Sequence, residues 1–191
     1  MTRRNRSRWP LRSALVAAAL GGAIIAGDGV FMVAKAELGQ VLLDRAYADG
    51  LSEPWPGADV RPVARLRVPS LERTVVVLDS ASGKAMAWGP GHVAGSTLPG
   101  NPGLSAIGGH RDSHLAFLGE LGPGTEVIVE RPAHPDRSYR ITHAEVVDSR
   151  IWRYPLDPGG PPRLALTTCW PLDAQAQGPM RLVVYAEAST G

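Results

Sequence analysis

The feature that most constrains this chain is a series of short runs of β-branched and aliphatic residues, separated by clusters of Gly, Pro and Asp. The runs are ARLRVPSL, TVVVLD, LSAIGG, TEVIVE, SYRITHAEVV, RLALTTC and RLVVYAE. Such runs are typical of short strands, and the clusters between them, such as GPGHVAGSTLPGNPG and YPLDPGGPPR, predict turns. Seven or eight short strands over residues 63–191 indicate a mostly β domain, either one barrel or a sandwich.

Length and composition fit one compact domain with an accessory segment. The 191 residues include 22 Gly and 17 Pro, and 44% are hydrophobic, which is enough for a core in a loop-rich body. A short helix is also predicted within the domain, because Leu115, Leu118 and Leu121 recur at helical spacing in RDSHLAFLGEL.

The N-terminus carries a basic tail followed by an apolar segment. Residues 1–12 hold five arginines and no acid, which leaves 15 basic side chains (20 less these five) against 18 acidic ones and gives no case for nucleic-acid binding. Residues 13–36, interrupted by Asp28, exceed the length of about 20 residues that spans a bilayer, although the string AKA at 34–36 resembles a signal-peptide cleavage site. We predict an uncleaved single-pass anchor in the cytoplasmic (inner) membrane. Its N-terminus would lie in the cytoplasm and the rest of the chain would be exported.

Residues 37–62 connect this segment to the domain. Apolar residues recur there at helical spacing, namely Leu38, Val41, Leu42 and Ala46. This pattern, followed by Gly50, predicts a short amphipathic helix near the membrane or against the domain. The string LSEPWPGADVRPVA then predicts an extended, Pro-rich linker.

The single cysteine, Cys169, ends one of the predicted strands. Most lone cysteines are small buried hydrophobic residues, but an unpaired cysteine in an exported domain is uncommon. Cys169 lies directly before Trp170-Pro171, at a strand end facing a loop, where catalytic side chains are often found.

Two other polar residues have comparable positions. His110 follows LSAIGG, so it lies at a strand end beside two glycines that permit a close approach. Arg181 begins the final strand and would face the same cleft as Cys169 if those strands pair. Each alone fits a structural role, a loop histidine or a solvated edge arginine. Together they supply a thiolate to attack a carbonyl, an imidazole to protonate the leaving amine and a guanidinium to meet the oxyanion.

The strings around these residues resemble those of the sortases, the membrane-anchored cysteine transpeptidases of bacteria. The string LTTC at 166–169 matches the L-x-T-C part of the sortase signature T-L-x-T-C, with Ala165 in place of the first Thr. Arg181 follows the cysteine by twelve residues. His110 stands in I-x-G-H-R, where Gly109 replaces the Ala of several sortase classes. More narrowly, GPGHVAGSTLPGNPG, GHRDSHLAFLGEL and TCWPL resemble the proteobacterial "marine" sortases.

The resemblance implies an eight-stranded β-barrel and catalytic roles for Cys169, His110 and Arg181. It implies that the protein cleaves a sorting motif near the C-terminus of a partner protein, forms a thioester on Cys169 and passes the acyl group to an amine. Thr168, beside the nucleophile, is expected to contact the substrate.

No cofactor and no metal are expected. The sequence has no C-x-x-C or H-E-x-x-H string, and Asp157 is the one acid in SRIWRYPLDPGGPPR, the loop that corresponds to a calcium site in some sortases. L,D-transpeptidases place His and Cys together in S-H-G-C, whereas here 59 residues separate them, and papain-like hydrolases have the reverse order. The remaining alternative is a membrane-tethered, non-catalytic barrel that binds envelope proteins or peptides, with Cys169 as a buried structural residue.

Overall fold

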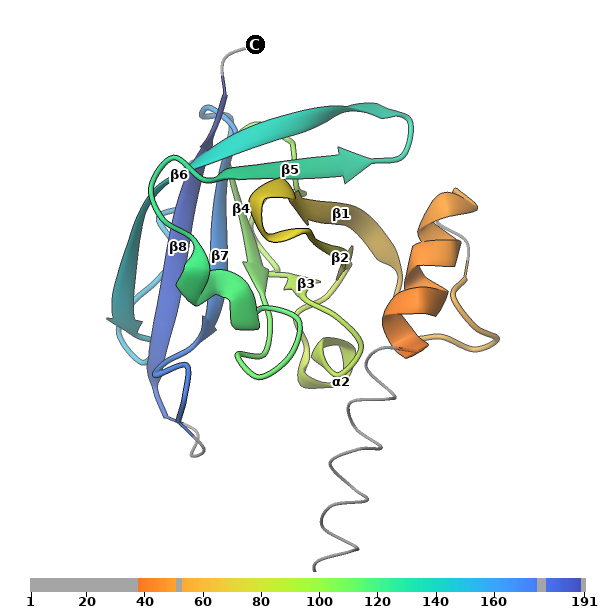
Figure 1. Cartoon of the computed structure of the whole chain (residues 1–191), viewed down its shortest axis with the longest axis horizontal. Coiled ribbons are helices and arrows are strands. Elements are labelled where there is room, and N and C mark those ends of the chain that lie inside the picture. The colour runs from red at the N-terminus through yellow and green to blue at the C-terminus, as the bar shows by residue number, and fades with distance from the viewer. Residues whose placement is uncertain (1–37, 51–52, 175–177, 190–191) are drawn as a thin grey trace, which may run out of the picture. The chain divides into compact units, whose positions relative to one another are not determined.

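The computed structural model describes residues 38–50, 53–174 and 178–189. Eight strands close into a barrel in the order β1-β2-β3-β4-β7-β8-β6-β5 (Figure 1). The strands are β1 Pro62–Val68, β2 Arg73–Leu78, β3 Gly91–His92, β4 Leu104–Gly108, β5 Glu126–Arg131, β6 His134–Asp148, β7 Arg163–Cys169 and β8 Met180–Ala188. The short helices are η1 Pro69–Leu71, α2 Gly83–Met86 and η2 Ala116–Glu120, and a further helix covers residues 38–48. The predicted mostly β, eight-stranded barrel is confirmed.

The strand pairing that matters most for function joins β4, β7 and β8, which run side by side in Figure 1. β4 pairs with β7 in parallel, from Leu104↔Arg163 to Gly108↔Thr167. β7 pairs with β8 in antiparallel fashion and ends at Cys169↔Arg181. The carboxyl ends of β4 and β7 therefore meet the start of β8 at one edge of the barrel.

The barrel interior holds the main hydrophobic core. Ile107 of β4, Leu164 and Leu166 of β7 and Val184 of β8 all point into it, and so does Leu118 of η2. Leu115, Leu118 and Leu121 are all buried, so the short helix predicted from their spacing is confirmed as a 3-10 helix that contributes to this core.

A second apolar cluster covers the outer face of the same strands. Ala106, Ala165 and Val183 lie in it, together with Trp152 and Tyr154 from the loop between β6 and β7. Because side chains alternate along a strand, these residues define which positions of β4, β7 and β8 face outward. The β6/β7 loop is thereby packed over the outward face.

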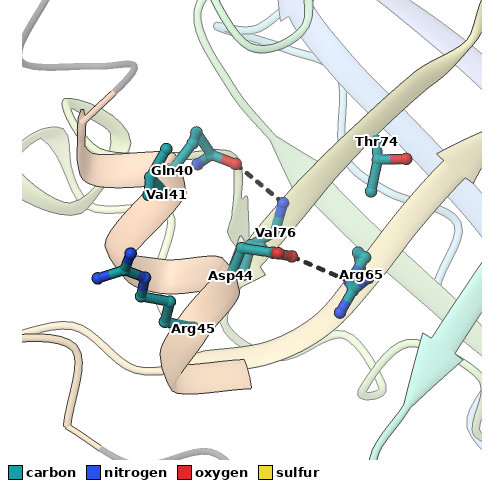
Figure 2. A pocket seen from close by; sticks show the side chains of 7 residues that line it. All are labelled: Gln40, Val41, Asp44, Arg45, Arg65, Thr74 and Val76. Atoms are coloured by element: carbon teal, nitrogen blue, oxygen red, sulfur yellow. Dashed lines mark hydrogen bonds and ion pairs between the residues drawn. The ribbon is translucent and has the colours of Figure 1, made fainter. Parts of the chain in front are cut away.

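The helix over residues 38–48 docks against β2 through specific polar contacts (Figure 2). The amide of Gln40 accepts a hydrogen bond from the Val76 N–H at 3.0 Å and donates to the Trp88 carbonyl at 2.8 Å. The Asp44 carboxylate lies 3.3 Å from the Arg65 guanidinium. Leu43 is fully buried in a cluster with Val76.

The predicted helix is present, but of its four predicted apolar residues only Ala46 is buried. Of the four residues at helical spacing, Leu38 and Val41 are exposed at 59% and 52%, Leu42 is half-buried, and Ala46 is buried. Leu43 and Tyr47, which are not in the predicted set, are buried beside Ala46. Gly39 allows this face of the helix to pack against Trp88, because a Cβ on residue 39 would lie only 2.7 Å from the Trp88 ring.

Residues 53–61, within the predicted linker, have no regular secondary structure but pack against the domain. Trp55 lies 4.6 Å from Trp88 between ring centroids, and Val60 is buried. The described residues belong to one compact unit. The predicted basic tail and the anchor at 13–36 lie outside the described residues. Among residues 38–50, 53–174 and 178–189, no helix has the length and apolar character needed to cross a bilayer.

Candidate active site

Cys169 ends β7 with a free, half-buried thiol. Ala165 belongs to the outer cluster and Leu166 to the barrel interior. Continuing this alternation places Thr167 and Cys169 on the outward face. The thiol therefore lies on the side of the sheet that the β6/β7 loop flanks, outside the barrel core.

Arg181 lies directly opposite Cys169, because the two residues are register partners in the β7–β8 pair. Val183, two residues on, belongs to the outer cluster, so Arg181 shares the face of Cys169. Its guanidinium Nη1 donates to the carbonyls of Gly178 at 2.6 Å and Met180 at 2.8 Å. The sequence predicts a shared cleft for Arg181 and Cys169 if their strands pair, and β7 and β8 do pair.

His110 reaches the same edge from β4. The parallel register ends at Gly108↔Thr167, and continuing it by two residues brings His110 level with Cys169. The Gly109 N–H still donates to the Thr167 carbonyl at 3.1 Å, so the two chains remain adjacent beyond the last strand pair. His110, like Cys169 and Arg181, is half-buried. Three residues distant in sequence thus lie at the same level of one accessible edge.

Thr168, predicted to contact the substrate, is almost fully enclosed. It is 2% exposed, and its hydroxyl donates to the Gly109 carbonyl at 2.9 Å. This bond joins the residue before the cysteine to the residue before the histidine. The substrate contact stays a prediction.

Tyr154 of the β6/β7 loop is a site residue that the sequence did not single out. Its hydroxyl donates to Thr167 Oγ1 at 2.9 Å, two residues before the cysteine on the same face. The pKa of Tyr154 is raised, because burial outweighs the lowering effects of the bond to Thr167 and of the Arg181 charge. A single tyrosine in a Pro-rich loop has no periodicity that could have identified it.

The described residues contain no group of three or more His, Cys, Asp or Glu side chains able to hold a metal ion. The carboxylate of Asp157 instead lies 3.6 Å from Arg163. The expectation that the protein needs no metal or cofactor stays a prediction.

The Sortase domain family model matches residues 66–189, which includes the three residues at the barrel edge. This chain belongs to the sortase family. Sortase D of Bacillus subtilis (strain 168) is 24% identical over 125 residues, covering 65% of this chain and 63% of that protein. The chain therefore spans less than two thirds of the length of that relative.

Solved sortase structures share the fold. Sortase A from Corynebacterium diphtheriae aligns with a TM-score of 0.62 at 20% identity, covering 71% of this sortase and 64% of that chain. A Clostridium perfringens Sortase D5 transpeptidase aligns with a TM-score of 0.62 at 14% identity, covering 82% of this sortase and 99% of that chain. The barrel is thus the sortase barrel, although few of its residues are identical to those of these neighbours.

Proposed function

We propose that this sortase is a cysteine transpeptidase that cleaves a sorting motif near the C-terminus of a partner protein. The observation that carries the proposal is that Cys169 and Arg181 are register partners at the edge where β7 ends and β8 begins, and that His110, two residues past β4, lies level with Cys169. A purely structural role for Cys169, as in a binding barrel, would not account for a half-buried thiol at the same strand level as a histidine and an arginine.

The chemistry is acyl transfer in two steps. The Cys169 thiolate attacks the scissile carbonyl, a C–S bond forms, the C–N bond breaks, and His110 gives its proton to the departing amine. An acceptor amine then attacks the thioester, the new C–N bond forms, the C–S bond breaks, and His110 takes up the amine's proton. Arg181 meets the oxyanion in both steps, because guanidinium keeps its charge and presents donors in a fixed fork.

Location and subgroup belong to the same proposal. The arginines of residues 1–12 and the apolar segment 13–36 support a single-pass anchor in the inner membrane, with the catalytic domain exported. Reporter fusions after residues 12 and 191 test this topology, because an alkaline phosphatase fusion is active only outside the cytoplasm. The strings GHRDSHLAFLGEL and TCWPL support the marine sortase subgroup.

A ligation assay tests the activity. The full-length chain in detergent is incubated with peptides carrying LPxTG-like motifs, with and without glycine or a diaminopimelate-type amine, and products are separated by chromatography. We expect a ligated peptide that depends on both the amine and Cys169. Cleavage with water as the sole acceptor would show a protease. No product from any peptide, together with a Cys169 thiol inert to alkylation, would support the binding barrel.

A further inference from the structure

Two side-chain hydrogen bonds extend the β4–β7 pairing beyond the last backbone pair. The Thr168 hydroxyl donates to the Gly109 carbonyl at 2.9 Å, and Arg111 Nη1 donates to the Pro171 carbonyl at 3.0 Å. Each bond joins the segment that carries His110 to the segment that carries Cys169. They add to the backbone bond from the Gly109 N–H to the Thr167 carbonyl.

The two bonds bracket the site on both segments. On one side they end at Gly109 and Arg111, the two neighbours of His110. On the other they start from Thr168, directly before Cys169, and end at Pro171, two residues after it. Both His110 and Cys169 therefore lie between these two side-chain bonds, just beyond the backbone bond from the Gly109 N–H to the Thr167 carbonyl.

Burial makes the Thr168 bond the stronger constraint. Thr168 is 2% exposed and Gly109 is buried, so loss of the hydroxyl would leave the Gly109 carbonyl without that partner in an enclosed position. The Arg111 bond is more exposed, but the β7/β8 loop that it reaches has a second contact with the domain. The Leu172 side chain packs against η2 so closely that its Cδ1 lies 2.4 Å from where a Cβ on Gly119 would be.

We propose that Thr168 and Arg111 are positioning residues that hold His110 opposite Cys169. The proposal rests on the acyl-transfer function above and names two residues that determine its geometry. Thr168 fixes the backbone before the imidazole. Arg111 holds the β7/β8 loop after Cys169 through the Pro171 carbonyl. The contact of Leu172 with η2 holds the same loop from its other side. Neither residue needs to touch the substrate for this role.

The expected effects follow from geometry. A displacement of about 1 Å between reacting groups can cost on the order of 100-fold in rate. We therefore expect Thr168→Val, which keeps the side-chain shape, to lower kcat by roughly 10- to 100-fold with KM little changed. Thr168→Ser retains the donor and should recover most of the rate. Arg111→Met should lower kcat by a smaller factor, because its bond is exposed to water.

The experiment includes a readout that does not depend on peptide turnover. The rate at which iodoacetamide alkylates Cys169 is measured against pH in the wild type and in His110→Gln, which gives the profile of a thiol without its imidazole. We expect the Thr168→Val profile to move toward that of His110→Gln and the Thr168→Ser profile to stay with the wild type. Thr142→Val and Arg153→Met are matched controls, because their side chains bond to carbonyls of β8 and of the β6/β7 loop.

Folding is checked by the midpoint of urea unfolding. A folded Thr168→Val with wild-type kcat and alkylation profile would overturn the proposal for Thr168. If Thr168→Val does not fold, Thr168→Ser and Arg111→Met carry the test. An Arg111→Met variant with wild-type kcat and a wild-type alkylation profile would overturn the proposed role of Arg111. If the alkylation profile of Cys169 depends on His110 but the wild-type protein ligates no peptide, the proposed function is refuted and the positioning role stands. Ligation that Thr168→Val leaves unchanged would refute the positioning alone.

Discussion

At the scale of single residues, the site depends on how Arg181 is held. Its Nη1 donates to two carbonyls of its own chain, Gly178 and Met180, which orients the fork at the start of β8. A guanidinium has five N–H donors, so this anchoring leaves others to meet an oxyanion beside Cys169. Arg181 thus combines a structural tether with the electrostatic role proposed for it.

Replacing Arg181 tests that role. We expect Arg181→Ala to lower kcat for peptide ligation by about 100- to 1,000-fold, as loss of an oxyanion donor does elsewhere. The kcat of Arg181→Lys should fall between those of the wild type and Arg181→Ala, because the lysine ammonium keeps the charge but lacks the planar fork of donors. Steady-state kinetics on one peptide gives both values, with Arg153→Lys as the surface control. Activity of Arg181→Ala within twofold of the wild type would refute the role.

Gly109 is the residue where this sequence departs from the Ala of several sortase classes, and the structure gives a reason. A Cβ there would lie 2.8 Å from Leu115 Cγ and 3.3 Å from Pro90 Cβ. We expect Gly109→Ala to reduce the free energy of unfolding by about 1–3 kcal/mol through overpacking. Urea unfolding measures this, with Gly122→Ala as the control, because a Cβ at Gly122 meets nothing within 4 Å. An unchanged midpoint for Gly109→Ala would show that Leu115 moves freely.

At the scale of elements, the helix over residues 38–48 shows what periodicity could and could not predict. The spacing of Leu38, Val41 and Ala46 predicted a helix correctly. It could not select the buried face, because Leu43, Ala46 and Tyr47 form a second apolar stripe at equally good spacing. The choice depends on Trp88 and β2, which lie far along the chain and leave no local signal.

The Gln40 bridge in Figure 2 should hold this helix in place. Gln40→Leu removes both of its hydrogen bonds and leaves the Val76 N–H without that partner, so we expect a loss of about 1–3 kcal/mol in unfolding free energy. Val41→Ala, on the exposed face, should stay within about 0.5 kcal/mol of the wild type. Equal unfolding midpoints for the two variants would show that the bridge contributes nothing.

The β6/β7 loop begins with an ion pair that should make stability depend on pH. Arg150 Nε donates to both carboxylate oxygens of Asp148, at 2.9 and 3.1 Å, and these bonds lower the pKa of Asp148 from 3.8 to about 2. A pKa lowered on folding stabilises the protein above the unfolded value, and the gain is lost as pH falls.

We therefore expect the difference in stability between the wild type and Asp148→Asn to be full above about pH 4 and to shrink as the pH falls toward about 2. Urea unfolding at intervals from pH 2 to 6 follows it, with Asp59→Asn as an exposed control. A difference that is constant across this range would contradict the coupling.

At the scale of the whole molecule, the site exists because the barrel closes in one particular order. The strand-forming runs predicted a β domain but left barrel and sandwich open, since strand order depends on pairings between distant segments. His110 and Cys169 lie at the same level because β4 and β7 are parallel neighbours, although the two residues are 59 positions apart in sequence. The motif strings identified the three polar residues. The enclosure of Thr168 and the contact of Tyr154 with Thr167 required the folded chain.

Intact mass spectrometry of the full-length chain incubated with a sorting-motif peptide tests the central claim most directly. We predict an adduct on Cys169 with the mass of the peptide's N-terminal fragment, absent in Cys169→Ala and lost when an acceptor amine is added. An adduct that persists in Cys169→Ala would contradict the claim that this barrel edge is the active site of a transpeptidase. So would a folded wild type that forms no adduct with any peptide and resists alkylation at Cys169.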